Sequence, residues 1–225
     1  MNVEVNGILA HELKSPLALM RQLAFSLDSE HPEQIDRTKT QLISVSERAL
    51  RQVNDLTKIA RLEDGLFVME PVAVRAVCED VTRELSALFR YNQRNLHLHY
   101  SNKSRLVVAN RELLYSVIYN FCLNAMHYSG TETSSELTVQ DHHGKVRVTI
   151  RDFGPALPLK IWRQLKTGWV EQPTAVSMRP GSSGLGLYIA SKFSRYMHAN
   201  VGAIRHRDGT SFFVELPVSY QTSLF

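Results

Sequence analysis

The chain has 225 residues, of which 44% are hydrophobic and 21% charged, and its 26 Lys and Arg against 22 Asp and Glu give a formal net charge of +4. These values are ordinary for a soluble globular protein of one or two domains, and they exclude disordered, collagen-like and disulfide-rich chains. The basic excess is small and scattered, so no nucleic-acid partner is expected. Cys78 and Cys122 are the only cysteines and lack metal-ligand spacing, which predicts two reduced thiols and no structural zinc.

No apolar run approaches the about 20 residues that a membrane-spanning helix needs. The N-terminus lacks the basic and apolar segments of a signal peptide. We therefore expect a cytoplasmic chain with no membrane contact of its own, either by itself or as the cytoplasmic part of a membrane-bound receptor.

The first 62 residues predict two amphipathic helices. Apolar residues recur at spacings of three and four from Leu9 to Leu27 and again from Ile35 to Ala60, and the cap and breaker residues 28–32 separate the two sets. Helices joined so tightly are expected to pack antiparallel, and one such pair has too little core to stand alone. We therefore predict a homodimer in which two hairpins form a four-helix bundle.

Beyond Leu62 the residues Glu63-Asp64-Gly65 indicate a linker, and strand-like runs then alternate with helical ones. This mixture predicts an α/β sandwich with helices on one face of a sheet, so that the whole chain is of the α+β class. The strands are expected at 66–70, 96–100, 105–108, 137–141, 145–151, 201–205 and 211–215. The helices are expected at 72–91, 111–128, 159–165 and 185–197.

His11 lies outside the apolar stripe of the first helix. At about 100° per residue it falls about 160° from Leu13, and Ser15 lies one turn below it on the same polar side. A lone histidine in such a position is usually a solvated surface residue. Here Glu12 adds a carboxylate that can keep the imidazole neutral and oriented, and Pro16 follows as a helix-kinking residue. His11, Glu12 and Ser15 are therefore the candidate catalytic residues, with His11 as the nucleophile.

Asn120 and Asn124 lie four residues apart, so both amides project from one face of a predicted helix, with His127 near them. Amide oxygens can ligate Mg²⁺ while phosphate oxygens complete its coordination shell. Taken alone, the pair is better explained by two capping or surface asparagines.

Two glycine-bearing segments follow. A strand-like run ends in Asp152-Phe153-Gly154, where a buried carboxylate can accept a hydrogen bond from an adenine amino group. Residues 181–186 form a glycine loop that runs directly into a helix, and the N–H groups at such a helix start suit phosphate. A lone glycine loop is a weak indication, because linkers have the same composition. Residues 207–212 read as a turn into the last strand.

The order of these motifs is more specific than any one of them. The chain resembles bacterial sensor histidine kinases in the sequence of their H, N and glycine boxes, over about residues 5–218. The matching motifs are His-Glu-Leu-Lys-Ser-Pro-Leu at 11–17, Asn-x3-Asn-Ala at 120–125, Asp-x-Gly at 152–154, Gly-x2-Gly-Leu-Gly-Leu at 181–187 and Gly-Thr-x-Phe at 209–212.

The resemblance implies that residues 1–62 form the dimerisation and histidine-phosphotransfer hairpin and that 63–65 is a linker. Residues 66–219 are then the ATP-binding domain, with the Bergerat (GHKL) fold shared with gyrase and heat-shock chaperones, and 220–225 a C-terminal tail. His11 is expected to attack the γ-phosphoryl group of ATP, and a response-regulator receiver domain is the expected partner and final phosphoryl acceptor.

The resemblance also implies the cofactors ATP and Mg²⁺. Asn124 is the expected principal Mg²⁺ ligand with Asn120 assisting, Asp152 reads adenine, and Gly184 and Gly186 line the phosphates. The full set expected at the nucleotide is Asn120, Asn124, His127, Asp152, Gly154, Gly184, Leu185, Gly186 and Thr210. Related ATPases carry a glutamate in place of Asn120; an amide cannot take a proton from water, so the residue favours transfer over hydrolysis.

Several positions depart from the family pattern. Ala156 replaces the last glycine of the first glycine box, which would cost about 1–2 kcal/mol if that position needs positive φ. His127 replaces a Lys or Arg that contacts phosphate and is mostly neutral at pH 7. The lid segment, between about residues 155 and 181, lacks a clear phenylalanine motif, and Trp162 or Trp169 is the candidate substitute. Ser15 keeps a hydroxyl where members that also dephosphorylate their partner often carry Thr or Asn.

Two alternatives remain at this point. One is a catalytically silent, histidine-kinase-like dimeric scaffold that regulates a response regulator, which Ala156, His127 and the unusual lid favour. The other is a Ser/Thr kinase of the anti-sigma-factor type, which shares the ATP fold but lacks a histidine-bearing hairpin.

Overall fold

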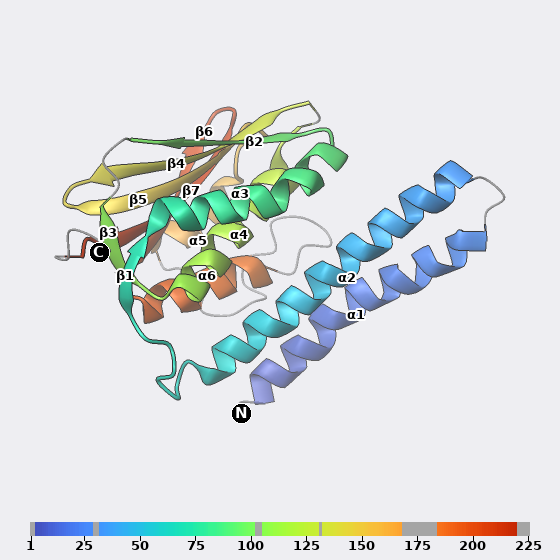
Figure 1. Cartoon of the computed structure of the whole chain (residues 1–225), viewed down its shortest axis with the longest axis horizontal. Helices are drawn as coiled ribbons and strands as arrows, with labels where there is room; N and C mark the ends of the chain where they lie inside the picture. The colour runs from blue at the N-terminus through green and yellow to red at the C-terminus, as the bar shows by residue number, and fades with distance from the viewer. Residues whose placement is uncertain (1–2, 29–31, 102–104, 131, 168–183, 220–225) are drawn as a thin grey trace. The chain divides into compact units, whose positions relative to one another are not determined.

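The computed structural model describes residues 3–28, 32–101, 105–130, 132–167 and 184–219, which belong to two compact units, Met1–Asp64 and Gly65–Phe225. The first unit is a hairpin of two helices, α1 (Val3–Phe25) and α2 (Pro32–Arg61), with a 3₁₀ turn η1 (Ser26–Asp28) after α1 (Figure 1). Helix α1 continues through Pro16. Among the described residues, no helix is long and apolar enough to cross a membrane.

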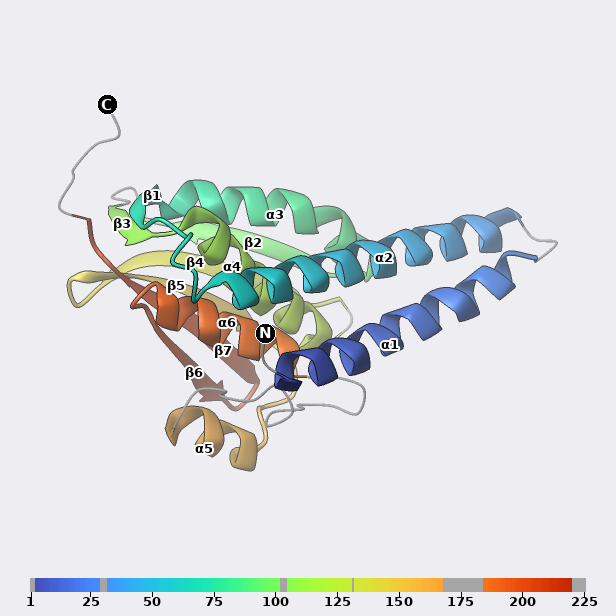
Figure 2. The same cartoon turned by 90° about the horizontal axis from the view of Figure 1, so that it is seen from below.

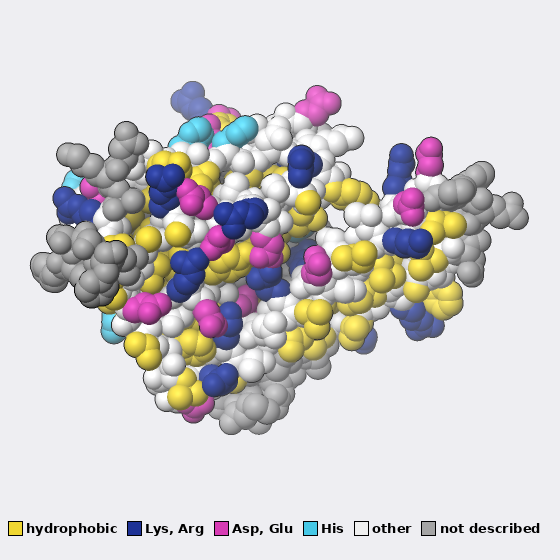
Figure 3. All heavy atoms as spheres, viewed as in Figure 1, with side chains coloured by type: hydrophobic (Ala, Val, Ile, Leu, Met, Phe, Trp, Pro, Cys, Tyr) yellow, Lys and Arg dark blue, Asp and Glu magenta, His cyan; other side chains and the backbone are white. Residues whose placement is uncertain are grey.

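The two helices of the hairpin pack along apolar stripes. The half-buried positions of α1 are spaced by three and four residues, as an amphipathic helix requires, and they are Leu13, Pro16, Met20, Leu23 and Leu27. The two helices meet where Ser46 Oγ of α2 lies 3.2 Å from Met20 Sδ of α1. Leu17 and Ala24, which belong to the apolar set predicted between Leu9 and Leu27, are exposed, and Leu23 is half-buried instead. Hydrophobic side chains thus remain on the hairpin surface, where Figure 3 shows them in yellow.

The second unit is built on a five-stranded sheet with the order β2-β4-β5-β7-β6. Only β2 and β4 run parallel, and the other neighbours are antiparallel. The strands are β2 (Asn95–Tyr100), β4 (Ser134–His142), β5 (Lys145–Asp152), β6 (Asn200–His206) and β7 (Gly209–Pro217). A separate antiparallel pair joins β1 (Glu70–Ala73) to β3 (Leu106–Ala109).

Helices α3 (Val74–Tyr91), α4 (Arg111–Tyr128) and α6 (Leu185–Tyr196) cover one face of the sheet (Figures 1 and 2), and α5 (Leu159–Thr167) contacts β6. The core between the layers includes the rings of Phe121 on α4 and Phe212 on β7, which stack at 5.6 Å. Both are at most 1% exposed. Burial of side chains of this size contributes about 1.5–3 kcal/mol each and fixes α4 against β7. The predicted α/β sandwich is therefore confirmed.

The strand predicted at 66–70 is wrong. Residues 66–69 lie outside regular structure, the strand is Glu70–Ala73, and helix α3 begins at Val74 rather than at 72. The apolar run from Leu66 to Met69 suggested a strand, but the side chains of Leu66 and Val68 are 55% and 72% exposed. Pairing with β3 decides the strand instead, and Pro71 is tolerated because β1 lies at an edge. The other elements predicted beyond Leu62 occur with ends displaced by no more than three residues, and α4 has the predicted bounds.

Candidate functional site

Asp152 is the last residue of β5. The strand alternates between half-exposed and buried positions, and Asp152 continues the buried set of Val146, Val148 and Ile150. It is 1% exposed, and its Oδ1 accepts hydrogen bonds from the backbone N–H groups of Gly154 and Thr210, each at 3.1 Å. The strand period thus places a carboxylate on the helix-covered face at the end of the sheet, where two amides orient it.

A pocket of about 140 Å³ opens beside this carboxylate. It is lined by Tyr128, Asp152, Pro155, Ala156, Leu157, Pro158, Thr210 and Phe212. Its size is close to that of the cavity of about 150 Å³ that holds benzene in an engineered protein, so it suits one flat ring system. Apolar walls with a single carboxylate select a planar heterocycle that carries a hydrogen-bond donor.

Two glycines allow the backbone to close around Asp152. A Cβ on Gly154 would overlap the carbonyl oxygen of Tyr128, at the end of α4. Gly209 has φ +133°, and a Cβ there would overlap the carbonyl oxygen of Asp152. The set of residues predicted at the nucleotide included Gly154 but not Gly209, although Gly209 belongs to the Gly-Thr-x-Phe motif and to the turn predicted at 207–212. Tyr128 and Phe212 as pocket walls were also missed, because which residues line a pocket depends on packing.

We expect Gly154→Ala to lower the free energy of unfolding by about 3 kcal/mol, since the added methyl meets backbone that cannot rotate away. Gly144→Ala is the matched control. Gly144 has positive φ, +76°, but its Cβ would have open space, so the loss there is expected to be about 1–2 kcal/mol. Urea unfolding of both variants measures the difference, and equal losses would contradict the close approach at Gly154.

The part of the pocket wall formed by Pro155, Ala156, Leu157 and Pro158 is held from strand β6. Arg205 Nε donates a 2.7 Å hydrogen bond to the carbonyl oxygen of Leu157, and Arg205 pairs in register with Thr210, which in turn pairs with Asp152. Ala156 in this wall is not among the described residues with positive φ. The backbone cost considered for alanine at this position therefore does not arise.

The two asparagines of α4 lie near the start of α6. Asn120 Nδ2 donates to the carbonyl oxygen of Ser116 at 2.8 Å, and a Cβ on Gly186 would lie 2.9 Å from Asn120 Oδ1. Among the buried side-chain nitrogen and oxygen atoms of the described residues, only Asn124 Nδ2 and Ser194 Oγ have no hydrogen-bond partner. A buried amide without a partner costs about 1–3 kcal/mol, which is typical of a group kept for a ligand.

The remaining predicted residues lie at element ends. Gly184 adopts the left-handed conformation, φ +71°, immediately before α6, and Leu185 is fully buried at the first position of that helix. His127 is half-exposed in the last turn of α4. The other glycine-loop residues, 181–183, lie outside the described residues, as does Trp169. Trp162 lies in α5 with the ammonium of Lys166 5.1 Å from its ring centroid.

His11, Glu12 and Ser15 all lie in α1. Ser15 is exposed, whereas the side chains of His11 and Glu12 lie outside the described part of the structure. The structure therefore brings together Asp152, Gly154 and Thr210 at one point and Asn120 and Gly186 at another.

Comparison with known proteins defines the class. Residues 109–220 match the family described as "Histidine kinase-, DNA gyrase B-, and HSP90-like ATPase". The chain therefore carries the ATPase domain of this family, and it is homologous to sensor histidine kinases along most of its length.

Three proteins illustrate the similarity. The sensor protein kinase PmrB of Pseudomonas aeruginosa is 28% identical over 212 residues, 92% of this chain and 43% of PmrB. The structure of full-length ShkA in complex with AMPPNP has a TM-score of 0.63 at 20% identity, over 97% of this chain and 46% of that one. Histidine kinase ThkA in complex with response regulator protein TrrA has a TM-score of 0.62 at 16% identity, over 96% and 62%. The chain thus spans less than half the length of PmrB and of ShkA.

Proposed function

We propose that this chain is the catalytic core of a sensor histidine kinase that binds ATP and Mg²⁺, phosphorylates His11 and passes the phosphoryl group to a response-regulator aspartate. The observation that carries the proposal is the buried Asp152 carboxylate in the wall of a ring-sized pocket. Its Oδ1 accepts hydrogen bonds from two backbone amides, which hold the carboxylate where it can also accept a hydrogen bond from the 6-amino group of adenine. Tyr128, Leu157 and Phe212 supply the apolar surface for the ring.

The amides of α4 fit a Mg²⁺ ion carried by the nucleotide. Asn124 has a buried amide nitrogen without a partner, and its side chain can turn to present Oδ1 to a cation. Asn120 uses its nitrogen on Ser116, so its oxygen is directed elsewhere, beside Gly186. We assign Asn124 as the principal ligand and Asn120 as the assisting one. The ion would neutralise charge on the phosphates during transfer.

The start of α6 suits the phosphates. Helix α6 has Gly184 at its N-cap in the left-handed conformation, and the N–H groups of the first turn of a helix are directed toward its N-terminus, where they suit an anion. The helix packs against α4, which carries the two asparagines. We assign the N-terminus of α6 as the part of the site that binds the phosphate chain of the nucleotide.

In the transfer step, an imidazole nitrogen of His11 forms a bond to the γ-phosphorus while the bond to the β-phosphate oxygen breaks and ADP leaves. The imidazole must be neutral to attack, and Glu12 is assigned to keep it so and to take up the proton. Water is a poor competitor, because the amide of Asn120 cannot act as a base. The complex of ThkA with TrrA supports a response regulator as the partner.

We also propose that the hairpin dimerises into a four-helix bundle. Leu17, Phe25, Ile43 and Leu50 are 57–70% exposed in the single chain. A second hairpin would bury these side chains, at about 25 cal/mol per Å² of apolar surface removed from water.

One of the observations that favoured the silent-scaffold alternative, the alanine at position 156, no longer supports it. Ala156 lacks the positive φ that would strain the site, whereas the substitution of His127 for a basic residue still distinguishes this chain. A chain without nucleotide binding would restore this alternative.

Asp152→Asn tests the proposed function by changing the group that recognises the adenine ring. The asparagine keeps an acceptor for the two amides but turns an NH₂ group toward the purine, so we expect ADP affinity to fall about 10- to 100-fold, as for loss of a hydrogen bond to a charged group. IDP carries a 6-oxo acceptor, so the same variant should bind IDP better than wild type does. Calorimetric titration with both nucleotides measures this reversal.

The control is Asp141→Asn, which changes an exposed carboxylate on β4 that pairs with Arg105 at 3.6 Å. It should leave both affinities unchanged. Equal ADP affinity of wild type and Asp152→Asn would overturn the assignment of the pocket to adenine.

A further inference from the structure

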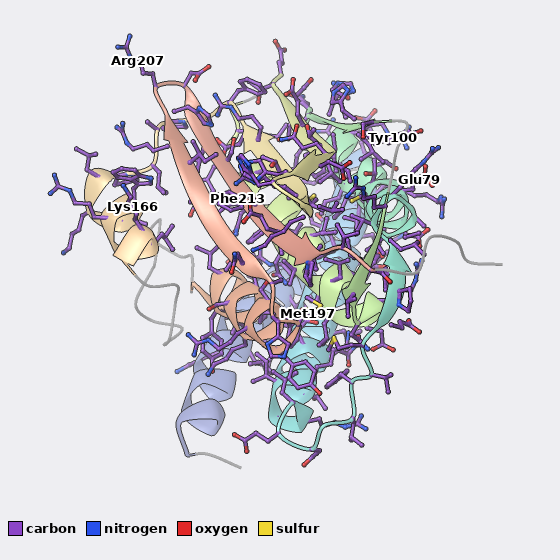
Figure 4. All side chains as sticks on the ribbon, turned by 90° about the vertical axis from the view of Figure 1, so that its left-hand side faces the viewer. Glu79, Tyr100, Lys166, Met197, Arg207 and Phe213 are labelled. Atoms are coloured by element: carbon purple, nitrogen blue, oxygen red, sulfur yellow. The ribbon has the colours of Figure 1, made fainter. Side chains whose placement is uncertain are left out.

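Arg151 precedes Asp152 on β5 and joins two parts of the fold. Its side chain is 14% exposed. Nη1 donates to the carbonyl oxygen of Asp152, and Nη2 donates to Asp208 Oδ1 at 2.7 Å. The guanidinium also lies 4.6 Å from the centroid of the Phe153 ring. One guanidinium therefore ties the end of β5 to the turn between β6 and β7, whose tip Arg207 marks in Figure 4.

This turn supplies part of the environment of Asp152. Gly209 lies against the Asp152 carbonyl oxygen, and the N–H of Thr210 donates to Asp152 Oδ1. The turn must therefore sit close to β5 for the carboxylate to keep its second amide. The pKa of Asp208 lies below its ordinary value, and the largest cause is the hydrogen bond from its own backbone N–H. Desolvation raises the pKa, whereas the hydrogen bond and the charge of Arg151 lower it further. Asp208 is thus charged when it meets the guanidinium.

We propose that Arg151 is a positioning residue of the nucleotide site, which clamps the β6–β7 turn through Asp208 so that Thr210 holds the Asp152 carboxylate toward the purine. The inference rests on the proposed function and adds to it two residues, Arg151 and Asp208, that belong to none of the motifs. The role needs an arginine, because only its planar fork can reach a backbone carbonyl and a carboxylate at the same time.

The test uses Arg151→Gln, Arg151→Lys, Asp208→Asn and the double variant Arg151→Gln/Asp208→Asn. We expect Arg151→Gln to weaken ADP binding roughly tenfold, the effect of losing one hydrogen bond to a charged group. In autophosphorylation the KM for ATP should rise by the same factor while kcat stays unchanged. Arg151→Lys should fall between wild type and Arg151→Gln, and the double variant should be no worse than Arg151→Gln, because the two residues act as a unit.

Arg147→Gln is the matched control. Arg147 lies on the same strand and the same face, donates to Glu215 Oε1 at 2.9 and 2.6 Å, and stacks over the ring of Phe213 at 4.3 Å. Its removal breaks a comparable arginine–carboxylate pair remote from the pocket. ADP affinity should therefore remain within about twofold of wild type, a smaller change than the loss of one such hydrogen bond. An equal loss of ADP affinity in both variants would overturn the proposal, because the effect would then come from the sheet as a whole.

Hydrogen exchange gives a readout without nucleotide. Arg151→Gln should speed exchange of the Thr210 amide, and Arg147→Gln should not. Unchanged Thr210 exchange in Arg151→Gln, or additive losses in the double variant, would overturn the clamp. If wild type binds no ADP, the proposed function fails, and the exchange of Thr210 alone then decides whether the clamp exists.

Discussion

His11→Gln is expected to abolish phosphoryl transfer from γ-labelled ATP and Mg²⁺ to the chain. An imidazole nitrogen can form a bond to phosphorus, whereas the amide of glutamine is not a nucleophile. Wild type should carry a label that is acid-labile and alkali-stable, as a phosphohistidine is, and His11→Gln should carry none.

His99→Gln is the control for this experiment, because His99 is an exposed histidine on β2. It should be labelled like wild type. Equal label in His11→Gln and wild type would contradict the assignment of His11. No label in any protein, with ATP still raising the melting temperature, would indicate an ATP-binding domain held inactive, since ligand binding to the native state alone raises stability.

Asn124→Ala is expected to reduce autophosphorylation about 100-fold or more while leaving the free protein at least as stable as wild type. The loss of activity follows from removing the principal Mg²⁺ ligand, since a metal ion contributes several kcal/mol to stabilising charge in the transition state. The stability follows from the structure, because the substitution removes a buried nitrogen that has no partner. Autophosphorylation rates at increasing Mg²⁺, together with urea unfolding of the nucleotide-free protein, test both parts.

Asn120→Ala provides the comparison. This residue donates to the Ser116 carbonyl oxygen, so its removal should cost about 1 kcal/mol of unfolding free energy and lower activity less than Asn124→Ala does. A destabilised Asn124→Ala variant that retains full activity would contradict the assignment of Asn124 as the ligand.

The sequence predicted best where a local pattern corresponds directly to a structural environment. The apolar density of 111–128 gave helix α4 with its observed bounds, and the alternation in β5 placed Asp152 on the buried face. Reasoning from local pattern failed at 66–70, because the apolar run 66–69 has no partner strand and its Leu66 and Val68 side chains remain exposed. Periodicity reports which side of an element is apolar, but the strand itself forms only where another strand supplies hydrogen bonds.

By itself, the sequence determined the order of the motifs, the two-helix hairpin and the α/β sandwich, because local spacing and composition carry these features. Only the tertiary structure decided how the motifs meet. It brought the Thr210 amide to a carboxylate 58 residues earlier in the chain and Gly186 against Asn120, and it joined Arg151 to Asp208. These contacts depend on strand order and register and on helix packing, which are set by the burial of side chains distant in sequence, so no local pattern encodes them.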